Sequence, residues 1–135
     1  MKKNRLAAFL LGPALVIGVV GAEETVLFVD SGQALGNNNS YSVALGDLDG
    51  DGDIDAMVAN TGLSGVSGES NTVWTNDGNG LFTNSQALGN GRSTSVALGD
   101  LDGDGDLDAM VANGIGFFPN TVWTNDGSGT FTNSG

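Results

Sequence analysis

A nearly perfect internal repeat constrains the fold of this 135-residue chain more than any other feature. The segment SVALGDLDGDGDIDAMVAN at residues 42–60 recurs at 95–113 with one change, from Ile54 to Leu107. The segment NTVWTNDG occurs at 71–78 and again at 120–127. Because a duplicated unit of about 50 residues builds the same local structure twice, we expect copies of one supersecondary unit rather than one ordinary domain.

Each unit is predicted to contain four short strands. In the first copy the expected strands cover 42–45, 56–59, 72–75 and 81–88. The first alternates, with Val43 and Leu45 on one face, and the second is continuously apolar, as expected for a strand buried on both faces. Residues 76–80 are Asn, Asp and Gly, which tolerate positive φ and predict a hairpin turn between the last two strands. No segment after residue 22 has helical periodicity.

Four strands in 40–50 residues are typical of a β-propeller blade. We therefore predict an all-β fold, a partial β-propeller of about two four-stranded antiparallel blades with Asp-rich loops between the first and second strands. The expected division is a signal peptide at 1–22, a first repeat at 23–84 and a second repeat at 85–135. A closed propeller needs about four to eight blades. Three alternatives stay open: a piece of a longer repeat protein, copies that assemble into a ring, or blades that stack openly.

The N-terminus has the order of a secretory signal peptide. Residues 1–5 are basic, 6–20 are apolar, and Val20-Gly21-Ala22 is a small-residue cleavage site. The apolar run is short for a membrane span and contains Pro13, so we expect cleavage rather than an anchor, and no transmembrane span afterwards. The predicted location is secreted or extracellular, with the periplasm or the cell surface as alternatives. The chain has no Cys, so it forms no disulfides there.

Charge excludes several functions. After residue 22 the only basic side chain is Arg92, against sixteen acidic residues, which gives a net charge of −15. A chain with one basic residue cannot neutralise phosphates, so nucleic-acid binding is excluded. No His, Cys or Lys remains there as a base or nucleophile, so we expect a protein that is not an enzyme.

Most of the acidic residues lie in two loops. Aspartates alternate over nine residues in each copy: Asp47, Asp49, Asp51, Asp53 and Asp55, then Asp100, Asp102, Asp104, Asp106 and Asp108. Carboxylates this close repel each other unless a cation lies among them, and Ca²⁺ takes six to eight oxygen ligands. Gly52 and Gly105 permit a sharp turn at the sixth position, and Ile54 and Leu107 are expected to anchor the loops to the core. An EF-hand loop also needs Glu at position twelve, which is Val58 or Val111 here.

The two loops and the segments after them resemble a known repeat. The pattern D-x-D-G-D-G-x-x-D between strands, followed by N-x-V-W-x-N-D-G-x-G-x-F, resembles the VCBS/FG-GAP repeat of bacterial secreted proteins and of the integrin α-subunit propeller. The chain has LGD in place of the FG, which is closer to the bacterial repeats. The resemblance implies two Ca²⁺ sites, with backbone carbonyl ligands from Asp53 and Asp106. The implied side-chain ligands are Asp47, Asp49, Asp51 and Asp55, and then Asp100, Asp102, Asp104 and Asp108.

A ligand surface is expected on the opposite side of the repeats. In an antiparallel blade the Asp-rich loops and the Asn-Asp-Gly turns share one end, so the loops that differ between the copies share the other. The candidate ligand residues there are Tyr41, Arg92, Phe117 and Phe118. Trp74 and Trp123 are expected to pack between blades, with stacking on sugars as the alternative.

These features predict a secreted, calcium-binding, non-catalytic repeat module for extracellular adhesion or protein and ligand interaction. The expected partner is an extracellular protein or a polysaccharide. The alternatives are a carbohydrate-binding, lectin-like module and a non-catalytic propeller segment of a larger secreted enzyme.

Overall fold

The computed structural model of the chain describes residues 7–11, 14–18, 29–62, 68–114 and 116–135. The chain divides into two compact units, Met1–Ser31 and Gly32–Gly135. In the first unit β1 (Ala7–Leu11) pairs with β2 (Ala14–Gly18) as an antiparallel hairpin. The predicted signal peptide falls in this unit, and its residues 1–6, 12–13 and 19–22 lie outside the described residues. Among the described residues no helix is long and apolar enough to cross a membrane.

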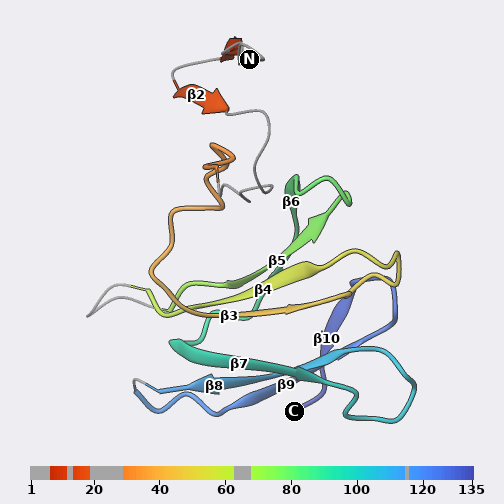
Figure 1. Cartoon of the computed structure of the whole chain (residues 1–135). Helices are drawn as coiled ribbons and strands as arrows, with labels where there is room; N and C mark the ends of the chain where they lie inside the picture. Colours follow the sequence, from red (N-terminus) through yellow and green to blue (C-terminus); the bar gives the residue numbers. More distant parts are fainter. Residues whose placement is uncertain (1–6, 12–13, 19–28, 63–67, 115) are drawn as a thin grey trace. The chain divides into compact units, whose positions relative to one another are not determined.

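The second unit contains two four-stranded antiparallel sheets, each with its strands in sequence order (Figure 1). Sheet I consists of β3 (Ser40–Gly46), β4 (Asp55–Asn60), β5 (Asn71–Asn76) and β6 (Phe82–Leu88). Sheet II consists of β7 (Ser93–Gly99), β8 (Asp108–Asn113), β9 (Thr121–Asn125) and β10 (Phe131–Asn133). The prediction of an all-β fold with two four-stranded antiparallel blades is confirmed.

The strands follow the sequence pattern closely. In β4, Met57 and Ala59 lie on one face and are fully buried, and Ala56 on the other face is buried as well, as predicted for this apolar run. The Asp-rich loops join β3 to β4 and β7 to β8, and the Asn-Asp-Gly turns join β5 to β6 and β9 to β10. Because neighbouring strands are antiparallel, these loops and turns lie at one end of the sheets, as predicted.

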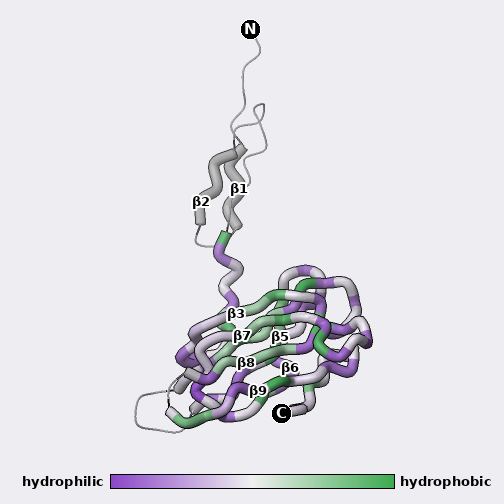
Figure 2. Tube along the Cα trace, turned by 90° about the horizontal axis from the view of Figure 1, so that it is seen from below, coloured by the Kyte–Doolittle hydropathy of each residue, from purple (hydrophilic) through white to green (hydrophobic). Residues whose placement is uncertain are grey.

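The two sheets share one hydrophobic core. We call the face of sheet I that carries Ala44, Met57, Ala59 and Val73 its inner face, because these residues join one cluster with residues of sheet II. The inner face of sheet II carries a different set of strand positions, namely Val96, Leu98, Ala109, Val111 and Trp123. Figure 2 shows apolar residues along the central strands of both sheets. The sheets therefore pack through unlike faces of a repeated unit.

Two equivalent glutamines, Gln33 and Gln86, each form hydrogen bonds with the edge of the next sheet along the chain. Gln86 in β6 of sheet I accepts a hydrogen bond from the Phe131 N–H and donates one to the Phe131 carbonyl, both at 2.9 Å. Gln33 likewise accepts a hydrogen bond from the Phe82 N–H, the counterpart of Phe131, but it donates to the Gly80 carbonyl two residues earlier. The segment QALGN, which contains each glutamine, therefore contacts equivalent places in two successive sheets, with one of the two bonds the same. Sequence reasoning identified this repeat but not its contacts.

Candidate metal centre

The Asp-rich loop of sheet I is anchored by a buried carboxylate. Asp55, at the start of β4, is fully buried, and each of its oxygens accepts a backbone N–H bond at 2.8 Å, from Leu48 and from Asn76. A buried carboxylate is costly unless hydrogen bonds satisfy it, so these two bonds fix its position. The equivalent Asp108 accepts bonds from Leu101 and Asn125 at the same distance. Each loop thus closes onto the first residue of the strand that follows it.

Three carboxylates converge in each loop. Oxygens of Asp47, Asp49 and Asp55 lie within 4.8 Å of one another, and so do those of the equivalent residues Asp100, Asp102 and Asp108. Clusters of this kind can hold a metal ion through oxygen ligands. The predicted ligands Asp51 and Asp104 have another contact in this structure, because their carboxylates accept the N–H of Asp53 and Asp106 at 2.8 and 2.9 Å.

The backbone turns inward around each cluster. Gly50 and Gly52 have φ of 78° and 94°, and Gly103 and Gly105 have φ of 90° and 100°, a conformation that other residues rarely adopt. The N–H groups of Gly50 and Gly52 donate to the Asp47 carboxylate at 2.8 and 3.1 Å. The loop then enters strand β4, whereas the loop of an EF-hand enters a helix.

The carboxylates destabilise one another's charged state. Desolvation, with the negative charges of Asp55 and Asp51, raises the pKa of Asp49. Desolvation, with the charges of Asp104 and Asp108, raises the pKa of Asp102. A bound cation would reverse these charge effects, because an opposite charge close by favours the ionised carboxylate. The donor set, the geometry and the charge therefore all fit a hard divalent cation.

In the adjacent Asn-Asp-Gly turns the aspartate pKa is lowered, the opposite of the shift in the Asp-rich loops. The N–H groups of Asn79 and Leu81 donate to the Asp77 carboxylate at 2.9 and 3.1 Å and lower its pKa. The hydroxyl and N–H of Ser128 donate to Asp126 and lower its pKa in the same way. The direction of the pKa shift therefore distinguishes these two turn aspartates, whose pKa is lowered, from Asp49 and Asp102 in the clusters, whose pKa is raised.

The two Asp-rich loops differ in their support. The Asn125 side chain from sheet II donates to the Leu48 carbonyl in the loop of sheet I at 2.8 Å, and Leu48 itself is buried. The prediction that Ile54 and Leu107 both anchor their loops is wrong for Ile54. Leu107 packs against the shared core, but Ile54 is 51% exposed because it lies on the side of sheet I that faces away from sheet II.

Comparison with known protein families identifies a repeat that includes the second Asp-rich loop. Residues 61–111 match the FG-GAP-like repeat. The matched range runs from the connection before β5 into β8, so it contains parts of both sheets and the whole of the second Asp-rich loop. The match is consistent with an FG-GAP-type repeat protein and confirms the resemblance predicted from the loop motif. No curated protein and no solved structure matches the chain.

FG-GAP repeats suggest a β-propeller-like module, and the tryptophans fit this arrangement in part. Trp123 is buried between the two sheets, as predicted. Trp74 lies on the other side of sheet I and is half-buried. Each indole N–H donates to a threonine hydroxyl at 2.9 Å, from Trp74 to Thr72 and from Trp123 to Thr121. The two copies thus have the same local contacts but different surroundings.

The four predicted ligand residues have different surroundings in the part of the chain that the structure describes. Phe118 lines a hollow of about 180 Å³ beside Trp123 and Pro119. Tyr41 is exposed on β3, Phe117 is fully exposed, and the Nε of Arg92 is buried with no hydrogen-bond partner among the described residues. Residues 63–67 and 115, which belong to the same variable loops, lie outside the described residues.

Proposed function

We propose that the chain is a calcium-binding, non-catalytic repeat module that works outside the cell in adhesion or ligand interaction. The observation that carries this proposal is the pair of carboxylate clusters, each with three aspartates within 4.8 Å, at equivalent positions of the two repeated units, together with the match of residues 61–111 to the FG-GAP-like repeat. FG-GAP repeats are typical of extracellular proteins, and an export signal at residues 1–22 would place this chain there.

Calcium suits these loops better than other common ions. The clusters offer only carboxylate and backbone oxygens, and hard cations prefer oxygen. Zinc and other borderline ions favour imidazole and thiolate ligands, and the sequence contains neither His nor Cys. The irregular loop, with two glycines at positive φ, fits the variable geometry of Ca²⁺ better than the strict octahedron of Mg²⁺.

Calcium would act on stability. A chain without disulfides gains stability from any ligand that binds only the folded state, by about 2.7 kcal/mol when the free ligand is at 100 times its Kd. The loops join the first two strands of each sheet, so cation binding there fixes the pairing of β3 with β4 and of β7 with β8. We therefore assign the ions a structural role.

The test is a Ca²⁺ titration of the chelator-treated chain by calorimetry, with thermal unfolding in parallel. We expect two binding events and a higher Tm with Ca²⁺. Asp49→Asn and Asp102→Asn should each remove one event. Asp53→Asn and Asp106→Asn are matched controls, because they remove the same charge from the same loops but leave the proposed backbone carbonyl ligand in place. If Ca²⁺ changes neither the Tm nor the circular dichroism, the proposal is wrong.

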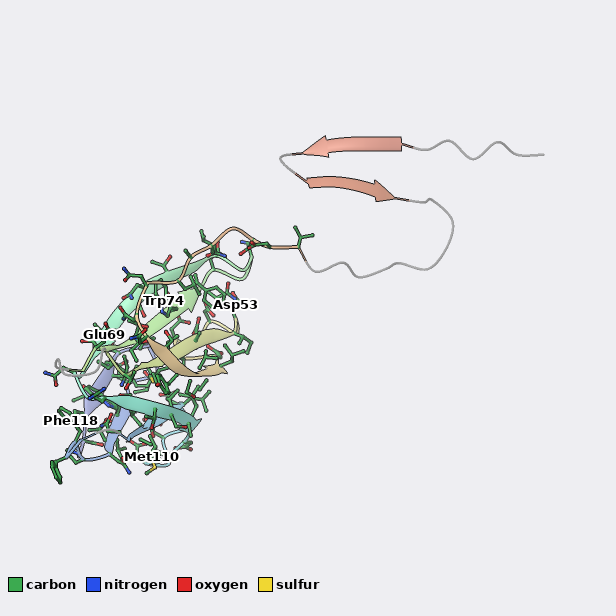
Figure 3. All side chains as sticks on the ribbon, turned by 90° about the vertical axis from the view of Figure 1, so that its left-hand side faces the viewer. Asp53, Glu69, Trp74, Met110 and Phe118 are labelled. Atoms are coloured by element: carbon green, nitrogen blue, oxygen red, sulfur yellow. The ribbon has the colours of Figure 1, made fainter. Side chains whose placement is uncertain are left out.

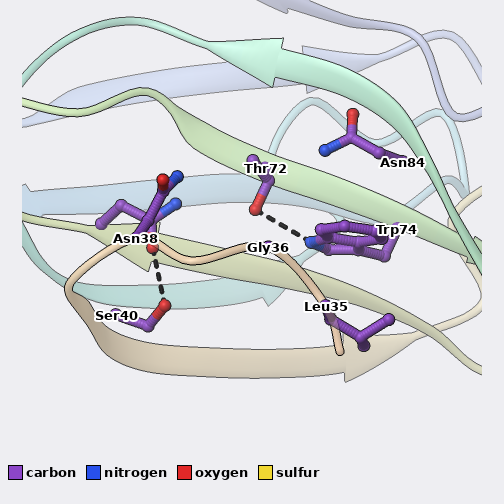
Figure 4. A pocket seen from close by; sticks show the side chains of 8 residues that line it. Leu35, Gly36, Asn38, Ser40, Thr72, Trp74 and Asn84 are labelled. Carbon is purple, nitrogen blue, oxygen red and sulfur yellow. Dashed lines mark hydrogen bonds between the residues drawn. The ribbon is translucent and has the colours of Figure 1, made fainter. Parts of the chain in front are cut away.

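A second candidate function is carbohydrate binding, and a repeated hollow favours it. In sheet I, Trp74, Thr72 and Asn84 line a hollow of about 190 Å³ with Leu35 and Gly36 (Figure 4). Trp123, Thr121 and Asn133 line the equivalent hollow in sheet II. An indole with amide and hydroxyl groups beside it suits a small polyhydroxylated ligand. Binding on a glycan array that Trp74→Ala weakens would support this function.

A further inference from the structure

Among the described residues of the second unit, the packing of the two sheets leaves two complementary faces exposed. The inner face of sheet I contacts the inner face of sheet II, and these are opposite faces of the repeated unit. The outer face of sheet I therefore carries Val43, Leu45 and Trp74, and the equivalent residues of sheet II pack into the shared core. The outer face of sheet II carries the residue types that sheet I buries, as the following pairs show.

Equivalent residues have opposite exposure. Met57 on the inner face of sheet I is 0% exposed, and the equivalent Met110 on the outer face of sheet II is 51% exposed. Val96 on the inner face of sheet II is 8% exposed, and the equivalent Val43 on the outer face of sheet I is 58% exposed. Figure 3 labels Trp74 in sheet I and Met110 in sheet II. Each of these exposed side chains has a buried counterpart in the other sheet. The contacts of that counterpart show which surface the exposed side chain can pack against.

The loops repeat this relation. Leu48 is 1% exposed, and its carbonyl accepts the Asn125 side chain of sheet II, whereas the equivalent Leu101 is 50% exposed. The turn of sheet II also reaches the loop of sheet I, since Gly129 lies close to Asp49. Asn76, the counterpart of Asn125, bonds within its own sheet to the Ile54 carbonyl at 3.2 Å. A second unit placed beyond sheet II would bring its Asn76 to the Leu101 carbonyl.

The strands carry no charge that opposes contact between these faces, and the acidic loops lie only at one end of that contact. Among the strand residues of β3–β10 only Asp55 and Asp108 are charged, and both are buried at the ends of the sheets. The two outer faces are therefore apolar and small-residue surfaces without ionised groups. Exposed apolar faces of this kind mark interaction sites.

We propose that the outer face of sheet II binds the outer face of sheet I of a second copy of this chain, head to tail. The contact would reproduce the interface between the two sheets within one chain, with Met110 against the surface that includes Val43 and Leu45. Because the contact is heterologous, each added copy presents the same free face again, and the assembly grows until the rotation closes a ring. The proposal does not depend on the metal site, so the two can fail separately.

The test is sedimentation velocity of the full chain, with Ca²⁺ and with chelator, over a wide concentration range. We expect the wild-type chain to form species of at least twice the monomer mass. Met110→Glu and Leu45→Glu should each be monomeric, because each removes one of the two faces. An equimolar mixture of the two variants should form dimers and nothing larger, since only one pair of intact faces remains.

Thr83→Glu is the matched control, because Thr83 is exposed and pairs with Thr75, on the same side of sheet I as Val73 and not on its outer face, so it should leave assembly unchanged. Circular dichroism checks that each variant is folded. A wild-type chain that stays monomeric at every concentration overturns the proposal and points to a different protein as the occupant of these faces. Assembly that persists in Met110→Glu and Leu45→Glu overturns it as well.

Discussion

Sheets I and II carry almost the same residues in the same register, yet they bury opposite faces. Ala44, Met57 and Val73 of sheet I face the shared core, whereas their counterparts in sheet II face away from it. Local sequence determined the strands and the turns in both copies. Burial was determined by which neighbour each sheet has, and a repeated unit has a different neighbour on each side. The comparison shows how far a residue's role depends on its place in the stack.

The largest expected difference between the sheets concerns the two methionines. Met57→Ala removes a fully buried side chain, and such a cavity costs about 2–5 kcal/mol of unfolding free energy. Met110→Ala changes a side chain that is exposed in the monomer, so in samples dilute enough to be monomeric it should change the unfolding free energy by no more than about 0.5 kcal/mol. Urea unfolding of both variants in such dilute samples measures the difference. Equal losses there would show that the outer face of sheet II is covered within the monomer.

The two Asp-rich loops should differ in Ca²⁺ affinity, which sharpens the comparison. Each loop accepts an asparagine side chain from its own sheet, from Asn76 to Ile54 and from Asn125 to Leu107, both at 3.2 Å. Among the described residues only the loop of sheet I also accepts one from the other sheet, from Asn125 to Leu48 at 2.8 Å. One hydrogen bond contributes about 0.5–1.5 kcal/mol, so the first site should bind up to about tenfold more tightly. Asn125→Ala removes a bond from each loop, so it should weaken both sites in a calorimetric titration, whereas Asn76→Ala should weaken the first site alone. Identical affinities in the wild-type chain would contradict this.

Two equivalent glycines, Gly46 and Gly99, test the interface between sheets I and II, because a Cβ added at each would meet different neighbours. A Cβ added at Gly46 would lie 2.6 Å from Leu107 Cδ1, but one added at Gly99 would meet only Leu101 Cδ2 at 3.9 Å. The leucine end is flexible, so Gly46→Ala should cost about 1 kcal/mol, at the low end for overpacking, and lower the Tm by several degrees. Gly99→Ala should leave the Tm of the monomer unchanged. Thermal unfolding of dilute samples measures both.

The smallest expected effect is a pH dependence from the turns, which should be alike in both sheets. The hydrogen bonds of Asp77 and Asp126 lower their pKa in the folded state, so their contribution is present above the ordinary carboxyl pKa. It is lost as the pH falls from about 4 through the lower folded-state values. The double variant Asp77→Asn, Asp126→Asn should therefore lose less Tm than the wild type between pH 5 and 2. If both proteins lose the same Tm over this pH range, groups other than Asp77 and Asp126 cause the pH dependence.

Much of the fold follows from the sequence because its signals are local. Apolar alternation gave the strands, and Asn, Asp and Gly gave the turns. The clustering of Asp47, Asp49 and Asp55 followed from their spacing and from the glycines between them. The failures concern contacts between repeats. Ile54 and Leu107 occupy the same position, yet only Leu107 reaches a neighbouring sheet, and no local pattern distinguishes them.

The glutamine contacts have a consequence for solubility. The outermost strand of a sheet presents free N–H and carbonyl groups, which a strand from another molecule can pair with to begin aggregation. Gln86 occupies such groups of Phe131 in β10, and Gln33 does so for Phe82 and Gly80 beside β6. A side-chain amide has the same donor and acceptor as a peptide group but cannot extend the ladder. Each glutamine therefore occupies hydrogen-bonding groups that another molecule could otherwise pair with. This limits strand pairing between molecules in a chain that also exposes apolar sheet faces.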